Sequence, residues 1–335
     1  MKHNLVLGFL ILNIILAGCK SSVTYKYTEG KIYGTFYHIS YASEEDLQEE
    51  IRRQMESVNA SLSMFNPNSV IAKLNRNESD STDILFRKLF NTALQVYQAT
   101  DGAFDITVGP LVNAWGFGVK QNTFPDSARI DSIVRFVGME KLALVNDKIQ
   151  KKFPEIEMDA SSIAKGLGVD LVAELLDSRG IKDYMVEIGG ELRVKGFSNK
   201  KRAWRIGIDR PVDDVAAEDR QLQFIVGLTS GALATSGNYR NFYIHEGKKY
   251  AHTINPKTGY PVQTEILSAS VYARTCMESD AYATAFMVMG LQKSRQILQA
   301  DPELEACFIY TENGKLKTWE SPGFKKLIIQ EAPEE

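Results

Sequence analysis

Apolar residues recur every three to four positions in two stretches of the first third of the chain, which is the spacing of amphipathic helices. The first predicted helix begins at Ser43, and the acidic residues of its first turn suit the positive end of the helix dipole. The second runs from Asp83 to about Thr100, and a strand is predicted before both, at residues 31–41. The predicted buried faces are Leu47, Ile51, Met55, Val58 and Leu62 in the first helix and Ile84, Leu85, Leu89, Leu94 and Val96 in the second.

From residue 184 the pattern changes to short β-like runs bounded by glycine, proline and polar residues. The predicted strands are Tyr184–Lys195, Trp204–Asp209, Leu222–Leu228, Ile266–Ala273, Ala306–Tyr310 and Lys315–Trp319. Further helices are predicted over Val169–Ser178, Cys276–Met289 and Leu291–Gln299, with a surface helical region over Phe124–Val145. Because helices and strands occur in blocks and do not alternate strictly, we expect an α+β fold of mixed helices and largely antiparallel sheet.

Residues 234–261 are unusually rich in polar side chains for a connecting segment and hold two of the chain's four histidines, His245 and His252. Two β-like runs flank a Glu246-Gly247 turn, which predicts a hairpin. On this local pattern alone, a surface hairpin with solvated ends explains the segment as well as a functional site does.

The N-terminus has the features of an export signal. Lys2 and His3 precede the apolar run Leu5–Leu16, which is too short to predict a membrane span with assurance. The following Leu-Ala-Gly-Cys19 resembles a bacterial lipobox; the alternative is a plain signal peptide with an incidental cysteine. We therefore expect a lipoprotein signal peptide at 1–18, a lipid anchor on Cys19 facing the periplasm, a tether at 19–30, and one domain at 31–325 that could divide into two subdomains.

Composition narrows the functional classes. A net charge of −3 over 335 residues leaves no basic footprint, so no nucleic-acid partner is expected. The chain has no GxGxxG, GxxxxGK[ST], HExxH or GxSxG motif, so the corresponding nucleotide-binding, metalloprotease and hydrolase interpretations are unsupported. The two remaining cysteines, Cys276 and Cys307, fit buried apolar positions, although one bridge between them is possible.

Asp280 and Thr284 are four residues apart in a predicted helix, so a carboxylate and a hydroxyl share one face. Such hard oxygen ligands suit a Mg²⁺ ion that is completed by phosphate oxygens and water. A helix-stabilising Asp beside a back-bonded Thr would explain the pair equally well.

Two other short motifs carry weaker signals. The segment 160–166 places small residues and Lys165 at the start of a helix, where backbone N–H groups could hold a phosphate, but a capped helix with an exposed lysine has the same pattern. Gly189-Gly190 interrupts a predicted strand, which indicates a bulge or the close approach of a ligand.

Seven blocks of the sequence, in order, resemble the ApbE family of flavin transferases over roughly residues 34–289. The blocks are GAFDITVGPLVNAWGFG, MDASSIAKGLGVD, VEIGGELRVKG, WRIGIDRP, ALATSGNYRNFY, HTINPKTGYPV and MESDAYATAFMVMG. The resemblance implies an ApbE-like (T-fold-like) architecture. It also implies Mg²⁺-dependent transfer of FMN from FAD to a Thr or Ser hydroxyl of an exported or membrane acceptor protein, with release of AMP.

By position within these blocks, the resemblance implies that Asp280, Thr284 and an oxygen of Ser162 bind Mg²⁺ and that His252 is the catalytic base. Tyr33 stands where the family commonly has Met. The segments around Ser236 and Arg240 would shape the pocket, and His245 would be structural. The residues that the resemblance places around FAD are Tyr33, Phe65, Ala103, Phe104, Asp105, Asp159, Lys165 and Ile254.

Physical reasoning agrees with this site, because phosphoryl transfer needs charge neutralisation on the diphosphate and a positioned hydroxyl nucleophile. Two alternatives stay open at this stage. One is an FAD pyrophosphatase that passes FMN to water, and the other is a lipid-anchored FAD-binding protein without turnover. The presence of both His252 and the Asp280/Thr284 pair argues against the second, since binding alone needs no base.

Overall fold

The computed structural model describes residues 24–118, 124–211, 221–238, 242–245 and 248–331. The predicted signal peptide, Cys19 and the predicted pocket residues Tyr239 and Arg240 lie outside these ranges, as do the Glu246-Gly247 turn and the side chain of His245. Within the described residues, no helix is both long enough and apolar enough to cross a bilayer.

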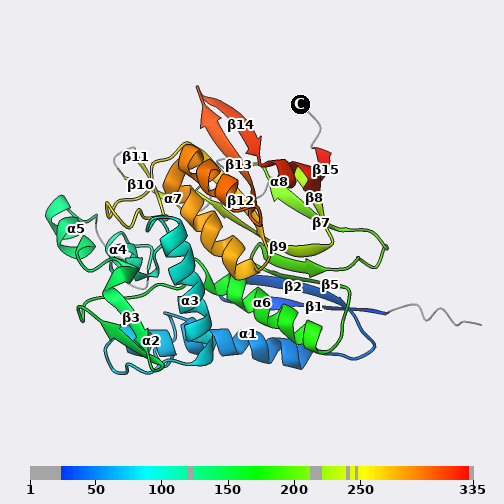
Figure 1. The fold of residues 1–335 in the computed structure, drawn as a ribbon, viewed down its shortest axis with the longest axis horizontal. Helices are drawn as coiled ribbons and strands as arrows, with labels where there is room; N and C mark the ends of the chain where they lie inside the picture. The colour runs from blue at the N-terminus through cyan, green and yellow to red at the C-terminus, as the bar shows by residue number, and fades with distance from the viewer. Residues whose placement is uncertain (1–23, 119–123, 212–220, 239–241, 246–247, 332–335) are drawn as a thin grey trace, which may run out of the picture.

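An eight-stranded sheet forms the centre of the molecule, with strand order β1-β2-β5-β6-β9-β12-β13-β14 (Figure 1). Every pairing between its neighbouring strands is antiparallel, which confirms the expected α+β class. Its strands are β1 (Tyr25–Ile32), β2 (Thr35–Ala42), β5 (Tyr184–Ile188), β6 (Glu191–Lys195), β9 (Ser230–Gly237), β12 (Ile266–Ala273), β13 (Glu305–Glu312) and β14 (Lys315–Glu320).

Helices cover one face of this sheet (Figure 1). They are α1 (Gln48–Leu62), α3 (Ile84–Ala99), α6 (Ala164–Ser178) and α7 (Cys276–Ala300). Ile39, Val186 and Ile188 of the sheet form a buried cluster with α1 and α6, and Val271 and Phe308 pack in a second cluster with α3 and α7. Burial of these apolar faces, at roughly 25 cal/mol per Å², is the main force that holds the layers together.

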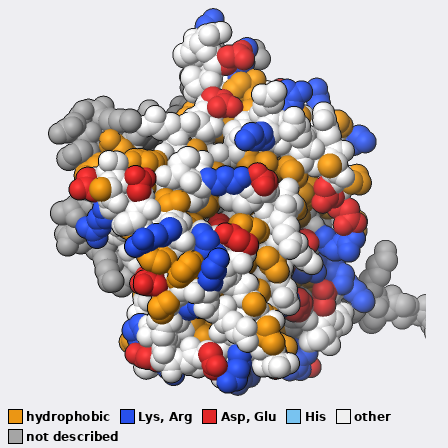
Figure 2. Space-filling model, turned by 60° about the vertical axis from the view of Figure 1, so that its left-hand side comes forward, with side chains coloured by type: hydrophobic (Ala, Val, Ile, Leu, Met, Phe, Trp, Pro, Cys, Tyr) orange, Lys and Arg blue, Asp and Glu red, His pale blue; other side chains and the backbone are white. Residues whose placement is uncertain are grey.

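The opposite face of the sheet packs against a second, three-stranded sheet. Because side chains alternate along a strand, Leu192 and Val194 of β6 point to this face and meet Trp204 and Val226. The elements of this layer are β7 (Trp204–Asp209), β8 (Leu222–Leu228), β15 (Ile328–Glu331) and the short helix α8 (Pro322–Leu327). On the surface shown in Figure 2, acidic and basic side chains are interspersed with apolar ones.

Smaller elements complete the fold beside α3 and α7. Two hairpins, β3–β4 and β10–β11, lie outside the main sheets; the second, in which Phe242 lies opposite Ala251, falls where the sequence predicts a hairpin. These elements are α2 (Val70–Asn75), the 3₁₀ turns η1 (Ile106–Val108) and η2 (Met139–Lys141), α4 (Gly109–Ala114), α5 (Ser127–Val134), β3 (Leu142–Val145), β4 (Lys148–Lys151), β10 (Phe242–His245) and β11 (Lys248–Ala251).

The two N-terminal helices keep most of their predicted apolar faces, although the first begins at Gln48 and not at Ser43. The whole predicted apolar face of α1 is buried. Asp83 caps α3, since its carboxylate accepts the Phe86 N–H at 2.8 Å. The predicted burial of Ile84 is wrong: its side chain is 69% exposed, because the core-facing row of α3 runs through Phe86, Leu89 and Phe90.

Several strand boundaries differ from the predictions because glycine turns divide what reads as one strand. Residues 31–41 belong to two strands, joined at Tyr33-Gly34 with φ of 51° and 76°, and β1 starts at Tyr25, so residues 25–30 belong to the sheet and not to a tether. Likewise Gly189-Gly190 is a turn between β5 and β6, not a bulge. The region 124–145 is only partly helical and ends in β3.

In the C-terminal half the observed helices and strands agree more closely with the predicted ones. β7, β8 and β12 have the predicted bounds. The two predicted helices at 276–299 form α7, which has a non-helical Gly290 (φ 74°, ψ 170°) at the predicted break. Cys276 and Cys307 are both buried and free, so the fold forms no bridge between them.

Candidate active site

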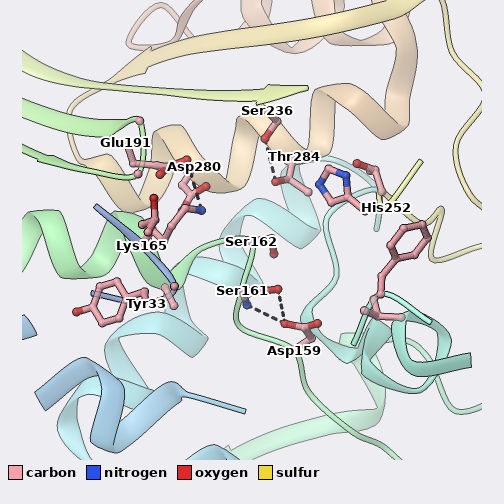
Figure 3. Close-up of a pocket in the computed structure, with 18 of the residues that line it drawn as sticks. Tyr33, Asp159, Ser161, Ser162, Lys165, Glu191, Ser236, His252, Asp280 and Thr284 are labelled. Carbon is pink, nitrogen blue, oxygen red and sulfur yellow. Dashed lines mark hydrogen bonds and ion pairs between the residues drawn. The ribbon is translucent and has the colours of Figure 1, made fainter. Parts of the chain in front are cut away.

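A cavity of about 1190 Å³ opens between the helical layer and the ends of the sheet strands. The metal-binding, catalytic and FAD-contacting residues that the resemblance implies all line this one cavity. They are Tyr33, Phe65, Ala103, Phe104, Asp105, Asp159, Ser162, Lys165, His252, Ile254, Asp280 and Thr284. Figure 3 shows Glu191, Asp280 and Lys165 grouped on one side of it and His252 beside Thr284 on the other.

Helix α7 presents Asp280 and Thr284 to the cavity, one turn apart as the spacing predicted. Asp280 is almost fully buried, and its carboxylate accepts the backbone N–H of Gly166 at 3.1 Å. Burial raises the pKa of Asp280, against the opposing effects of the Lys165 ammonium and that hydrogen bond. The Thr284 hydroxyl lies 3.3 Å from the hydroxyl of Ser236, which stands near the end of β9.

The start of α7 is held by Asp170, a buried acid of α6 that sequence reasoning missed. Its carboxylate accepts the N–H groups of Cys276 and Met277 at 3.0 and 2.9 Å and pairs with Arg193 at 2.8 Å. Thr275 and Glu278 add a capping box. These contacts set the position of α7, and with it the direction in which Asp280 projects.

Helices α6 and α7 cross so closely at Gly166 that no side chain fits there. A Cβ on Gly166 would lie 2.5 Å from the Cys276 carbonyl oxygen and 2.7 Å from the Met277 Cα, both backbone atoms that cannot rotate away. We expect Gly166→Ala to lower the free energy of unfolding by about 1–3 kcal/mol, measured by urea denaturation.

Gly227→Ala is the matched control for that substitution. There the nearest atoms to the new Cβ would be those of the exposed Ile329 side chain, at 3.0 Å, which can move, and the Ala203 Cβ would lie at an ordinary contact distance of 3.5 Å. Equal stability losses in the two variants would contradict the close-crossing explanation.

Lys165 and Glu191 form an ion pair at the edge of the cavity, with Nζ and Oε1 3.4 Å apart. Although burial alone would lower the pKa of Lys165, the charges of Asp280 and Glu191 raise it, so the side chain is a stable cation. Burial raises the pKa of Glu191, and the Lys165 charge opposes that rise. Glu191 directly follows the Gly189-Gly190 turn, which was the only sequence signal that pointed to it.

Asp159 and Ser162 lie on the segment that leads into α6. The buried Asp159 carboxylate accepts the Ser161 N–H at 2.8 Å and the Ser161 hydroxyl at 2.5 Å. Burial raises the pKa of Asp159, and these two hydrogen bonds oppose it. The turn leaves the Ser162 side chain on the cavity wall, as Figure 3 shows.

The apolar part of the cavity has a buried wall and an exposed rim. Phe104 and Ile254 are buried, whereas Phe65 is 73% exposed. The Tyr33 hydroxyl donates to the Met55 carbonyl at 2.7 Å, so its polar end is used within the fold. A flat apolar ligand could therefore enter past Phe65 and rest against Phe104.

Asp105 lines the cavity, but its carboxylate is used in hydrogen bonds within the fold. It accepts the Thr107 N–H and hydroxyl at 2.7 and 2.6 Å and the Met139 N–H at 3.2 Å. Burial raises the pKa of Asp105 to about 6, with these hydrogen bonds opposing. The folded state therefore binds the proton of the Asp105 carboxyl group more tightly than the unfolded chain does. The stabilisation that this proton contributes is fully present below about pH 4 and is lost as the pH rises through about 6.

Asp105→Asn tests this linkage, because an amide does not titrate. We expect the free energy of unfolding of the wild type, relative to the variant, to fall by about 3 kcal/mol between pH 4 and pH 7. Urea denaturation of both proteins across this range would measure it. A difference that stays constant with pH would contradict the assignment.

His252 follows β11 and contacts an aromatic cluster that joins the β10–β11 hairpin to the loop after α4. The Phe117 ring meets the His252 ring edge-on, with centroids 6.4 Å apart, and stacks on Tyr243 at 4.8 Å. Tyr243 in turn donates a hydrogen bond to the Trp115 carbonyl at 3.0 Å. This packing holds His252 at the cavity, where the resemblance of the HTINPKTGYPV block had placed it.

The comparison with known families decides the assignment. The profile of the ApbE family matches residues 33–308, most of the chain and all of the cavity's described lining. The chain belongs to the ApbE family.

Two curated relatives of this ApbE-family chain are both named FAD:protein FMN transferase. The FAD:protein FMN transferase of Vibrio cholerae is 36% identical over 94% of this chain and 96% of its own length. That of Escherichia coli K12 is 33% identical over 90% of this chain and 89% of its own.

Solved ApbE structures share the fold. The flavin transferase ApbE from Vibrio cholerae superposes with a TM-score of 0.82 at 33% identity and covers 91% of this chain and 99% of its own. The ApbE protein from Thermotoga maritima gives 0.80 at 26% identity, with 91% and 99% covered. The architecture implied by the sequence resemblance is confirmed.

The oxygen groups in the ApbE cavity suit Mg²⁺ bound with a phosphate ligand, and do not suit an all-protein metal cage. Among the described residues, no three His, Cys, Asp or Glu side chains gather closely enough to hold a metal. Asp280 supplies one carboxylate, and Thr284 and Ser162 supply hydroxyls on the same cavity. Mg²⁺ commonly takes one or two carboxylates and completes its shell with phosphate oxygens and water.

Proposed function

We propose that this ApbE-family chain is an FAD:protein FMN transferase that moves FMN from FAD to a Thr or Ser hydroxyl of an acceptor protein and releases AMP. The observation that carries the proposal is one cavity that brings together Asp280, Thr284, Lys165 and His252. The name shared by the curated relatives supports the same reaction.

FAD is a long ligand with two different ends, and the cavity offers a surface for each part. Its volume of about 1190 Å³ exceeds that of most small-molecule pockets. Phe104, Ile254 and Phe65 would contact the isoalloxazine ring. Lys165 and the Asp280/Thr284 face of α7 would lie at the diphosphate.

The chemistry is a displacement at phosphorus. The acceptor oxygen bonds to the FMN phosphorus, the bond between that phosphorus and the AMP oxygen breaks, and the hydroxyl proton passes to His252. Mg²⁺ on Asp280, Thr284 and Ser162 would supply charge neutralisation for the diphosphate and the AMP leaving group. Lys165 contributes a fixed positive charge, and the aromatic packing around Phe117 keeps the His252 ring oriented.

The N-terminal sequence supports a proposal for where the reaction takes place. We propose that residues 1–18 are removed as a lipoprotein signal peptide and that acyl chains on Cys19 tether the enzyme to the membrane on its periplasmic side. An enzyme held there would meet exported or membrane acceptor proteins.

The proposal is tested with the soluble chain, FAD, Mg²⁺ and an acceptor fragment that carries an Asp-x-x-[Ser/Thr]-Gly-Ala-[Thr/Ser] segment. In-gel flavin fluorescence follows covalent labelling, and chromatography follows AMP. Fluorescent acceptor with equimolar AMP is the expected result. AMP and FMN without labelling would indicate a hydrolase, and bound FAD without either product would indicate a binding protein.

A further inference from the structure

The described lining of the cavity has more acidic than basic side chains, although the proposed ligand, FAD, is itself negatively charged. Among its described lining residues, the basic side chains are Lys165 and the histidine His252. The acidic ones are Asp105, Asp159, Glu191, Asp209 and Asp280. FAD brings a diphosphate with two further negative charges, so the cavity by itself repels the ligand at its phosphate end.

Glu191 is the acid least compensated at that end. Its side chain is 6% exposed, and Oε1 pairs with Lys165 at 3.4 Å. Oε2 is buried without a hydrogen-bond partner among the described residues, which is costly for a carboxylate oxygen unless a ligand or water satisfies it. Asp159 and Asp105, by contrast, use their oxygens on nearby Ser, Thr and backbone groups.

Glu191 also pairs with Lys165 and so offsets the positive charge that would otherwise face the diphosphate. Lys165 lies between two carboxylates, those of Glu191 and Asp280, and Figure 3 shows the three side chains together. The three groups carry a net formal charge of −1 before any ligand enters. A divalent cation would reverse that sign, whereas Lys165 alone cannot.

We propose that Glu191 makes FAD binding depend on the divalent cation: its buried carboxylate keeps the phosphate end negative until Mg²⁺ is present. This inference rests on the proposed function and concerns a positioning residue, not one of the metal ligands. In thermodynamic terms the binding of Mg²⁺ and the binding of FAD are coupled, so that each ligand increases the affinity for the other by the same factor.

Glu191→Gln removes the charge and keeps the shape of the side chain. We expect the variant to bind FAD more tightly than the wild type without metal, and the factor by which Mg²⁺ raises FAD affinity to shrink about tenfold. Flavin fluorescence titrations with EDTA and with saturating Mg²⁺ measure both quantities without turnover.

Two further variants separate charge from structure. Glu191→Asp keeps the charge and should keep most of the Mg²⁺ dependence. Glu187→Gln makes the same chemical change on the same hairpin, outside the cavity lining. The Glu187 carboxylate pairs with His38 and accepts the Gly190 N–H at 2.6 Å, a bond that the Gln amide oxygen can still accept, so this variant should match the wild type. Thermal denaturation checks that each variant folds.

The outcomes distinguish this inference from the proposed function. A Mg²⁺ factor in Glu191→Gln within about threefold of the wild-type value overturns the role of Glu191 while FAD binding by the wild type stands. Failure of the wild type to bind FAD at any Mg²⁺ concentration overturns both.

Discussion

Asp280→Ala is expected to lower Mg²⁺-dependent flavin transfer by about a thousandfold or more. Asp280 is the one carboxylate among the three proposed metal ligands, since Thr284 and Ser162 offer only neutral oxygens. Without it, the hydroxyls would have to hold a hydrated divalent cation alone, and the charge on the diphosphate would stay uncompensated. The measurement is AMP release and acceptor fluorescence over a Mg²⁺ titration.

Glu174→Gln is the matched control for the loss of an acid. Glu174 lies on the surface of α6 and pairs with Lys88, with side chains 48% and 35% exposed, so it should retain wild-type activity. A cooperative thermal transition in Asp280→Ala would show that the fold survives. Full Mg²⁺-dependent activity in that folded variant would remove Asp280 from the metal site.

His252→Ala is expected to slow transfer to the acceptor by about 10²- to 10⁴-fold while FAD still binds, because general-base catalysis contributes a factor of this size. The Phe117 ring and the aromatic cluster behind it remain, so the cavity wall keeps its shape. Single-turnover labelling with preformed enzyme–FAD complex separates the chemical step from binding.

His38→Ala gives the histidine control, since His38 pairs with Glu187 on the large sheet and does not line the cavity. Unchanged labelling rates in His252→Ala would exclude His252 as the base and leave the metal assignment standing. A parallel loss in His38→Ala would point to a general effect on folding.

The site residues were accessible from the sequence because they sit in short local patterns. The four-residue spacing of Asp280 and Thr284 is a property of any helix, and the sequence alone predicted that they share a face. The seven blocks then identified the family, and every residue carried over from them lines the same cavity.

The misplaced boundaries share one cause. At Tyr33-Gly34 and at Gly189-Gly190 β-like residues stand directly on both sides of the turn, so the pattern reads as one strand. Positive φ angles at both positions of each turn reverse the chain instead. The error at Ile84 is similar, because the helical period was right but the core side was set by packing against other helices.

Other residues could be found only from the tertiary structure. Asp170 holds the first turn of α7 across a separation of 106 residues, and no local pattern marks such a contact. Glu191 gains its significance from Lys165 and from the burial of Oε2, which depend on how β6 meets α6.

The sequence by itself determined the α+β class, most elements and the identity of the residues at the site, because periodicity, turn chemistry and motif spacing are local. The tertiary structure decided which of those residues share a cavity and how their charges balance. Burial and electrostatic interaction are sums over neighbours that are distant along the chain, as with Lys165 between Glu191 and Asp280.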